Sequence, residues 1–310
     1  MISNIFYEAF QTSSLWMVFL IIINLILCIY PILGAMFWFF GALSYVLFRQ
    51  KEELPPKAEL TTEPFITIMI PAHNEEIVIK STLEYLLTQL NYHNYEVLVM
   101  DDGSDDRTPE ILHSMQTKYS RLRVIRIEQN QGKAHAFNIG LFFAKGEYIL
   151  SNDADTIPET DALIKYMQYF TSANGINYAA ITANMDVYNR SSLWGKSQTV
   201  EFSSIVGIIK RSQTAINNTM YAYSGANTMY RRDFLINVGG FRQDRATEDI
   251  SIAWDHTFIN ATPKFAPDIV FHMNVPETFH DLYRQRKRWA QGGSEVWLSN
   301  FLKVFRHPWQ

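Results

Sequence analysis

Residues 65–102 read FITIMIPAHNEEIVIKSTLEYLLTQLNYHNYEVLVMDD and contain two short apolar runs separated by a helical pattern. The runs Phe65–Pro71 and Tyr95–Asp101 have the length and composition of strands, and the apolar residues of Glu76–Leu90 recur at helical spacing. A strand, a helix and another strand in this order predict a βαβ unit with two parallel strands.

The same pattern continues downstream. Further strands are expected at Leu122–Glu128 and Glu147–Asn152, and further helices at Arg107–Tyr119 and Lys133–Ala144. This series predicts an α/β fold with a mixed, mainly parallel sheet flanked by helices, in which ligands bind at the carboxyl ends of the strands. Three polar groups come directly after expected strands, namely Asn74–Glu75, Asp101–Asp102 and Asp153–Asp155.

After Asp161 the pattern mixes helices and strands without strict alternation. Helices are expected at Ala162–Thr171, Leu193–Gln213, Arg232–Val238, Asp249–Ile259 and Thr278–Asn300, and strands at Tyr178–Met185, Tyr223–Tyr230 and Lys264–His272. Nothing between the two parts resembles a flexible linker. We therefore interpret residues 65–300 as one domain with two continuous halves, 65–160 and 161–300.

The first fifty residues differ from the rest, because Leu15–Phe48 contains no charged residue. A helix of this length exceeds the roughly 30 Å hydrocarbon core of a bilayer. The run predicts either one long helix kinked near Pro31 or a hairpin of two short spans, with a buried core helix as the alternative to both. Arg49 places its C-terminal side in the cytoplasm by the positive-inside rule. Residues 1–50 are thus expected to be a membrane anchor, and residues 51–64 a polar linker.

Composition excludes several classes of function. Lys and Arg total 27 against 31 Asp and Glu, and the formal charge of -4 is spread along the chain, so we expect no binding surface for nucleic acid. Cys28 is the only cysteine, which excludes an internal disulfide and a cysteine-rich zinc site. The sequence has neither a Gly-rich dinucleotide fingerprint nor a phosphate loop ending in Gly-Lys-Ser/Thr, so any nucleotide must be held another way.

Asp153 and Asp155 are candidate metal ligands at the end of an apolar strand. Hard divalent cations prefer oxygen ligands, and two carboxylates one residue apart can both reach one cation where a strand ends. A cation there could bridge a diphosphate and stabilise it as a leaving group. The alternative is that Asp-x-Asp forms a turn or caps a helix.

Asp101, Asp102 and Lys133 are candidate nucleotide contacts. The sequence Asp101-Asp102-Gly103-Ser104 lies between an expected strand and an expected helix, where carboxylates and backbone amides can meet a nucleoside. Lys133 lies near the N-terminus of the next helix, where anions gain from free amides and the helix dipole. The alternatives are a capped turn for the first group and a solvated surface lysine for the second.

Two helices in the second half carry further candidates. Thr247-Glu248-Asp249 opens one of them, at a position where acidic residues commonly act as caps. Gln285, Arg288 and Trp289 are three and four residues apart on the other and share one face. A planar Arg side chain fits a diphosphate, and an indole fits the apolar side of a sugar ring. The alternative is an amphipathic helix with a core Trp and basic residues that touch acidic lipid head groups.

Six motifs occur in this order: PAHNEE (71–76), DDGSDD (101–106), NQGKA (130–134), DAD (153–155), TED (247–249) and QRKRW (285–289). Together they resemble the processive branch of the family-2 glycosyltransferases, which includes cellulose, chitin, hyaluronan and poly-N-acetylglucosamine synthases. The resemblance covers residues 65–300. Within this branch the sequence most resembles the bacterial poly-β-1,6-N-acetylglucosamine synthases of biofilm matrix.

This resemblance implies the nucleotide-sugar transferase fold of the GT-A type. It also implies inverting transfer of a sugar, with N-acetylglucosamine from UDP-GlcNAc as the first choice, to a growing β-linked polysaccharide. Asp249 is then the general base, and Asp153 and Asp155 bind Mg²⁺ or Mn²⁺. The implied donor contacts are Glu75, Asp101 or Asp102, Lys133, Asp153 and Arg288, and the implied acceptor contacts are Ser224, Gly225, Gln285 and Trp289. Residues 65–160 become the nucleotide-sugar half and residues 161–300 the acceptor half.

The implied partners are a UDP-sugar, a polysaccharide and the lipid bilayer, and the implied location is the bacterial plasma membrane with the catalytic domain in the cytoplasm. Similar proteins continue into further membrane helices that form the exit path of the polymer. Residues 301–310 are therefore expected to begin a region that this sequence lacks, either because the sequence is truncated or because an additional membrane subunit supplies the path.

Two departures and two alternatives remain. Ser224-Gly225-Ala226-Asn227 differs from the Phe-Phe-Cys-Gly of cellulose synthases, which counts against cellulose, and His73 replaces the usual Tyr. The first alternative is a related synthase that uses another donor, such as UDP-glucose or UDP-glucuronate. The second is a non-catalytic membrane scaffold that binds a nucleotide, although the intact DAD, TED and QRKRW motifs argue against it.

Overall fold

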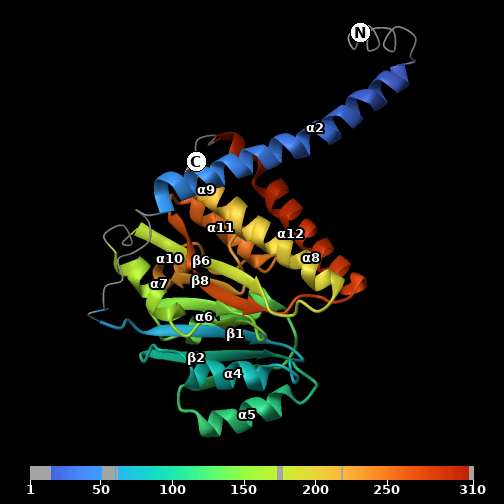
Figure 1. The fold of residues 1–310 in the computed structure, drawn as a ribbon. Coiled ribbons are helices and arrows are strands. Elements are labelled where there is room, and N and C mark those ends of the chain that lie inside the picture. Colours follow the sequence, from blue (N-terminus) through green and yellow to red (C-terminus); the bar gives the residue numbers. More distant parts are fainter. Residues whose placement is uncertain (1–14, 51–59, 61, 173–176, 218, 307–310) are drawn as a thin grey trace.

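The computed structural model describes residues 15–50, 60, 62–172, 177–217 and 219–306, and it confirms the α/β fold (Figure 1). The described strands form one eight-stranded sheet. Across the sheet their order is β3 (Leu122–Ile127), β2 (Tyr95–Asp102), β1 (Ile66–Ala72), β4 (Tyr148–Asn152), β7 (Asn227–Arg231), β6 (Tyr178–Val187), β8 (Thr262–Met273) and β5 (Ile157–Pro158).

The sheet is mixed and mainly parallel, as expected. β1 pairs in parallel with β2 and β4, β2 pairs in parallel with β3, and β6 pairs in parallel with β8. β7 is antiparallel to both β4 and β6, and the edge strand β5 is antiparallel to β8. The parallel group from the first half of the chain is thus joined to the second half through β7.

Helices cover both faces of the sheet, and each face has its own core. One core includes α4 (Ile79–Thr88), α5 (Thr108–Lys118) and α7 (Ala162–Thr171). The other includes α6 (Lys133–Phe143), α8 (Leu193–Phe202), α10 (Arg232–Asn237) and α11 (Glu248–Phe258). In β1, Ile68 and Ile70 face the first core and Met69 faces the second, because successive side chains of a strand point to opposite faces.

Two strands differ from the expectation. The strand expected at Tyr223–Tyr230 begins only at Asn227, which pairs with Asn152, the last residue of β4. Residues before Asn227 extend beyond the end of β4, and the main-chain O of Ser224 accepts a hydrogen bond from Asn227 N–H at 3.2 Å in a turn. The two-residue strand β5 was not expected.

Two long helices of the second half also differ in extent. The helix expected at Leu193–Gln213 consists of α8, a π-helical segment η3 (Ser203–Ile209) and α9 (Lys210–Asn217). The last described helix, α12 (Phe279–Arg306), continues past the expected end at Asn300. Residues 307–310 lie outside the described part of the chain.

The N-terminal apolar run forms one helix rather than a hairpin. α2 (Leu15–Ser44) contains Pro31 and continues into the π-helical η1 (Tyr45–Arg49). An 18-residue stretch of the combined helix has a mean hydropathy of 2.6, and the helix is long and apolar enough to cross a membrane. Figure 1 shows α2 projecting from the main body at its N-terminal end and lying against α9 at its C-terminal end. The approach is close, because a Cβ on Gly41 would lie 2.8 Å from Ser212 Cβ.

Most of the expected linker, namely residues 51–59 and 61, lies outside the described residues. Its last residues contact the loop that precedes β2. Asn94 Nδ2 donates a hydrogen bond to the main-chain O of Glu63 at 2.7 Å, and Tyr92 OH donates one to the main-chain O of Pro64 at 2.6 Å. These contacts hold the chain just before β1.

Candidate active site

The expected polar groups meet at one edge of the sheet. Ala72, the last residue of β1, pairs with Asp101 of β2, so the loops after these strands start side by side. Because β7 is antiparallel to β4 and Asn227 lies opposite Asn152, the loop before β7 reaches the same edge. The sheet therefore brings residues from both halves of the chain to a single site.

The first cavity at this edge has a volume of about 310 Å³, and we call it the acidic cavity. Its walls include His73, Glu75, Asp102, Lys133, Asp153, Asp155 and Arg288. Burial, together with the charges of Asp155 and Asp153, raises the pKa of Glu75 to about 7. Burial and the charge of Asp153 also raise the pKa of Asp155. The cavity thus contains negative charge that its own cations do not fully balance.

Asp153 and Asp155 are suited to bind a divalent cation. Their carboxylates are hard oxygen donors, and a cation would relieve the repulsion that raises the neighbouring pKa values. Within the described residues, no group of three or more His, Cys, Asp or Glu side chains forms a metal site by itself. A cation on this pair would complete its shell with phosphate and water oxygens, which is the usual mode for Mg²⁺.

Asp101 and Asp102 have different surroundings, because adjacent residues of a strand face opposite ways. Asp101 is buried, forms an ion pair with Arg126 of β3, and is not among the residues of the acidic cavity wall. Asp102 lines that cavity, and its carboxylate accepts hydrogen bonds from the N–H groups of Gln131 and Gly132 at 3.1 and 2.8 Å. The structure therefore brings Asp102, and not Asp101, to the site.

Lys133 joins the acidic cavity to a second one. It is the first residue of α6, and its Nζ lies 2.6 Å from Asp153 Oδ1 and 3.2 Å from Glu248 Oε1. Burial disfavours its charge, but the charges of Asp153 and Glu248 raise the pKa of Lys133 above the ordinary value. With its side chain 27% exposed, Lys133 is a charged component of the site and not a solvated surface lysine.

The second cavity has a volume of about 260 Å³, and we call it the inner cavity. It shares Lys133, Asp153 and Arg288 with the acidic cavity. All the expected acceptor residues line it, as does the expected base: Ser224, Gly225, Asp249, Gln285 and Trp289. Its apolar wall consists of Met185, Phe202, Val206 and Met273, among others. Two cavities that meet at shared charged residues can hold two reactants in contact.

Asp249 lies in the first turn of α11 and faces the inner cavity. Its Oδ2 accepts a hydrogen bond from Gly225 N–H at 3.1 Å, and its Oδ1 accepts one from Ile250 N–H at 2.8 Å. Burial, together with the charge of Glu248, raises the pKa of Asp249 to about 6. A carboxylate of this kind is charged at neutral pH and can accept a proton from a bound hydroxyl.

Gly225 lies among the charged groups that surround Asp249. A Cβ on this residue would lie 3.2 Å from Glu248 Oε1 and 3.3 Å from both Asp249 Oδ2 and Lys133 Nζ. Any larger residue would therefore narrow the space between the proposed base and the shared lysine.

The residues expected on one face of α12 do line the inner cavity. Gln285 Oε1 is buried without a hydrogen-bond partner in the described part of the chain, and Arg288 is an exposed residue that reaches both cavities. Trp289 packs edge-on against Phe202 at a centroid distance of 6.3 Å, and the guanidinium of Arg286 lies 4.2 Å from the indole centroid. Trp289 is thus fixed as a wall of the cavity.

Sequence reasoning missed Lys210. This residue is 7% exposed, lines the inner cavity, and donates a hydrogen bond from Nζ to Thr182 Oγ1 at 3.0 Å. Burial lowers the pKa of Lys210 to about 7. The available signal was spacing, since Gln198, Phe202, Val206 and Lys210 form a buried stripe with a period of four residues.

Two other residues of the site also lacked an assigned role. Glu248 is buried and forms the ion pair with Lys133 described above. Nothing in the sequence separated the role of Glu248 from that of Asp249. His73 lies in the wall of the acidic cavity, with Nδ1 2.8 Å from the main-chain O of Asp102. A proton on Nδ1 would link the loop after β1 to the end of β2.

Comparison with known proteins identifies the family. The model of glycosyl transferase family 2 matches residues 67–239. A poly-beta-1,6-N-acetyl-D-glucosamine synthase of Staphylococcus epidermidis is 34% identical over 278 residues, which are 89% of this chain and 66% of that protein. One from Staphylococcus aureus is 32% identical over 283 residues, with coverages of 90% and 68%. The chain therefore spans about two thirds of the length of these relatives.

Solved structures share the fold. A mannosyltransferase from Pyrobaculum calidifontis, in complex with GDP-Man and Mn²⁺, is 22% identical and has a TM-score of 0.65 over 87% of this chain and 74% of its own. Staphylococcus aureus TarS 1-349 in complex with UDP-GlcNAc is 20% identical, with a TM-score of 0.53 over 70% of this chain and 60% of its own. At these identities the likeness concerns the fold alone. The family match and the level of identity to the synthases show that this chain belongs to glycosyltransferase family 2.

Proposed function

We propose that the chain is the membrane-anchored catalytic part of an inverting transferase that moves N-acetylglucosamine from UDP-GlcNAc to a growing β-linked polysaccharide. The observation that supports this most is the position of Asp249, a half-buried carboxylate in the wall of a cavity that adjoins the acidic cavity. The choice of sugar comes from the staphylococcal relatives, which are named for poly-beta-1,6-N-acetyl-D-glucosamine synthesis.

The acidic cavity would hold the donor. Asp153 and Asp155 would bind Mg²⁺ or Mn²⁺, and the bound cation would supply positive charge beside the diphosphate. Arg288 lies where the two cavities meet, and its planar guanidinium suits phosphate oxygens. Glu75, Asp102 and Lys133 complete the proposed donor contacts.

Asp249 would act when the acceptor hydroxyl attacks. The carboxylate takes the proton of that hydroxyl. At the same time the hydroxyl oxygen bonds to the anomeric carbon, and the bond from this carbon to the diphosphate breaks. UDP leaves with the bonding electron pair, and no covalent bond between sugar and protein forms. The N–H of Gly225 holds the carboxylate toward the cavity during this step.

The inner cavity would hold the terminal sugar of the acceptor. Its apolar wall suits the faces of a sugar ring, and the unpaired Gln285 Oε1 can accept a hydrogen bond from a hydroxyl or an N-acetyl N–H. Ser224, Gly225 and Trp289 are the other proposed acceptor contacts, and they surround the same space.

We further propose that α2 crosses the bacterial plasma membrane with the catalytic part in the cytoplasm. Large apolar residues are exposed on the C-terminal half of α12, namely Trp297, Leu298, Phe301, Leu302 and Phe305. In Figure 1 this end of α12 and the helix α2 lie on the same side of the molecule, away from α4 and α5. An apolar helix end on the same side as a spanning helix suits the lipid boundary. Further membrane segments or an additional subunit would complete the path of the polymer.

A donor screen tests the proposed function. The full chain in inverted membrane vesicles would be given UDP-GlcNAc, UDP-glucose or UDP-glucuronate, with released UDP measured and the product subjected to linkage analysis. UDP release and polymer with UDP-GlcNAc alone are expected. Preference for another donor would support a related synthase, and UDP binding without turnover would support a nucleotide-binding scaffold.

A further inference from the structure

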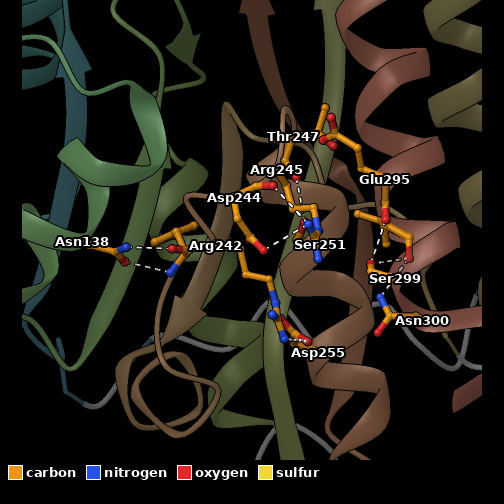
Figure 2. Close-up of polar contacts among 12 residues, drawn as sticks. Asn138, Arg242, Asp244, Arg245, Thr247, Ser251, Asp255, Glu295, Ser299 and Asn300 are labelled. Atoms are coloured by element: carbon orange, nitrogen blue, oxygen red, sulfur yellow. Dashed lines mark hydrogen bonds and ion pairs between the residues drawn. The ribbon is translucent and has the colours of Figure 1, made fainter.

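The segment 239–247, between α10 and α11, leads directly into the helix that carries Asp249. Figure 2 shows how it is held at its start by Asn138 of α6. Asn138 Nδ2 donates to the main-chain O of Phe241 at 2.7 Å, and Phe241 N–H donates to Asn138 Oδ1 at 2.8 Å. Further along, Arg242 makes two hydrogen bonds to Asp255 at 2.7 and 2.9 Å.

The end of this segment is held by α12. A Cβ on Gly292 would lie 2.5 Å from Thr247 Cγ2 and 2.7 Å from Thr247 Cβ, closer than side chains approach one another. Glycine is therefore required for α12 to pack this closely on the residue before α11.

A second contact from α12 is polar. Ala246 N–H donates a hydrogen bond to Glu295 Oε2 at 2.9 Å, and Gln291 Nε2 donates to Glu295 Oε1 at 2.7 Å. These two hydrogen bonds lower the pKa of Glu295, so its carboxylate stays charged. Gly292 and Glu295 thus contact adjacent residues of the chain, Thr247 and Ala246.

The start of α11 lacks the usual local fixation. Thr247 is its N-cap residue, but the Thr247 side chain makes no capping hydrogen bond, and its buried Oγ1 has no partner among the described residues. A normal cap would fix the first turn through the helix itself. Contacts from outside the helix therefore hold the first turn, and α12 provides those at Thr247 and Ala246.

We propose that Gly292 and Glu295 are positioning residues that set the location of Asp249 relative to the inner cavity. α12 lines that cavity with Gln285, Arg288 and Trp289 and contacts Thr247 one turn later, so one helix fixes both the acceptor wall and the base. This inference depends on the proposed function, because it requires Asp249 to act as the base. A displacement of about 1 Å at a reacting group can lower a rate about 10²-fold.

Neighbouring glycines provide a matched test. A Cβ at Gly293 meets nothing within 4 Å, whereas a Cβ at Gly292 meets Thr247. Gly292→Ala should lower kcat about 10²-fold, with UDP affinity and the KM for UDP-GlcNAc within about twofold, since the nearest atoms to the added Cβ all belong to Thr247, which lies beside the base and outside the acidic cavity. Gly293→Ala should retain normal kcat. Equal kcat values for the two variants would overturn the proposal.

A second-site change tests the mechanism. Thr247→Gly removes the side chain that Gly292→Ala would meet, and glycine is tolerated at an N-cap. The double variant should therefore have a kcat close to that of Thr247→Gly alone. Failure of the second change to restore kcat would show that Gly292 does not act through Thr247, and would overturn the inference.

Glu295 gives an independent measurement if Gly292→Ala does not fold. Glu295→Gln keeps an oxygen acceptor for Ala246 N–H and should retain most of kcat, whereas Glu295→Leu should lose kcat at unchanged UDP affinity. Equal kcat values for these two variants would contradict the role of Glu295.

Asp249→Asn distinguishes failure of the proposed function from failure of the positioning role. Full activity of this variant refutes the proposed base, whereas a low Asp249→Asn rate with a normal Gly292→Ala rate refutes only the positioning role.

Discussion

Asp249 is the residue at which binding and chemistry can be separated. Asp249→Asn keeps the shape of the side chain but removes its basicity, so turnover at saturating UDP-GlcNAc should fall by about 10²- to 10⁴-fold. Asp249 lies outside the wall of the acidic cavity, so the affinity for UDP, measured by titration calorimetry, should change little. Loss of UDP affinity with normal turnover would instead assign Asp249 to helix capping.

The raised pKa of Asp249 also predicts the pH dependence of turnover. Because burial raises this pKa to about 6, the carboxyl becomes protonated, and therefore inactive as a base, when the pH falls through 6. The kcat should decrease below this pH and level off above it. Glu75, with a pKa of about 7, is a second group that could produce such a limb. If kcat of the Glu75→Gln variant still decreases below pH 6, the decrease is due to Asp249. If kcat of this variant does not change with pH, the decrease is due to Glu75.

Metal dependence is expected to reside in Asp153 and Asp155. Asp153→Asn and Asp155→Asn should each abolish transfer, because either change removes one of two carboxylates available to the cation. Excess EDTA should inactivate the unmodified protein, and added Mg²⁺ or Mn²⁺ should restore UDP release. Full activity in EDTA would show that the pair has a structural role only.

The pair Asp101 and Asp102 shows what sequence could not decide at the scale of single residues. Both residues end the same strand, and alternation places them on opposite faces. Which face opens to the cavity depends on a neighbouring strand, because Arg126 of β3 lies beside Asp101 in the sheet and neutralises it. A single sequence contains the alternation but not the identity of the neighbour.

Elements were predictable where periodicity was strong. The four strands and three helices of residues 65–152 occur within a few residues of their expected limits, because each combines an apolar run with clear flanking breaks. The start of β7 was placed too early, although Gly225 and Asn227 are residue types that strands disfavour. In the structure β7 begins at Asn227, opposite the last residue of β4. Sheet neighbours, which are distant in sequence, decided that boundary.

The contact between α2 and α9 can be tested with two glycines of the same helix. A side chain at Gly41 would meet Ser212 and Ile216 of α9, whereas Gly34 has nothing within 4 Å. Gly41→Leu should therefore destabilise the protein by about 1–3 kcal/mol through overpacking, seen as a lower Tm in detergent. Gly34→Leu should leave the Tm unchanged. Equal effects of the two substitutions would mean that α2 and α9 do not pack as described.

At the scale of the whole molecule, the two halves expected from sequence form one site. Lys133 from the first half pairs with Glu248 from the second, and Asp249 accepts a hydrogen bond from the loop before β7, which joins the two sets of strands. The six motifs were readable in order, but their convergence depends on β7 running antiparallel to β4. Residues from both halves line each of the two cavities that are proposed to hold the donor and the acceptor.

The orientation of the whole chain in the membrane gives the last prediction. Leu15–Arg49 is the only candidate span among the described residues, and the rest of the described chain forms one body on its C-terminal side. Arg49 at the end of this helix favours a cytoplasmic position for that side, where UDP-sugars are made available to the proposed active site. A tag placed after Gln310 should therefore be protected from protease in intact cells and cleaved in inverted vesicles.

The same experiment needs two controls, a periplasmic and a cytoplasmic marker protein, to show that each preparation has the intended orientation. The chain should also remain in membranes after a carbonate wash, because about 30 Å of apolar helix would be buried in lipid if α2 spans the bilayer, and peripheral contacts alone do not survive that wash. Release into the supernatant would mean that α2 lies on protein or on the membrane surface. Cleavage of the tag in intact cells would show that the C-terminal side of α2 lies outside the cytoplasm, away from the proposed donor.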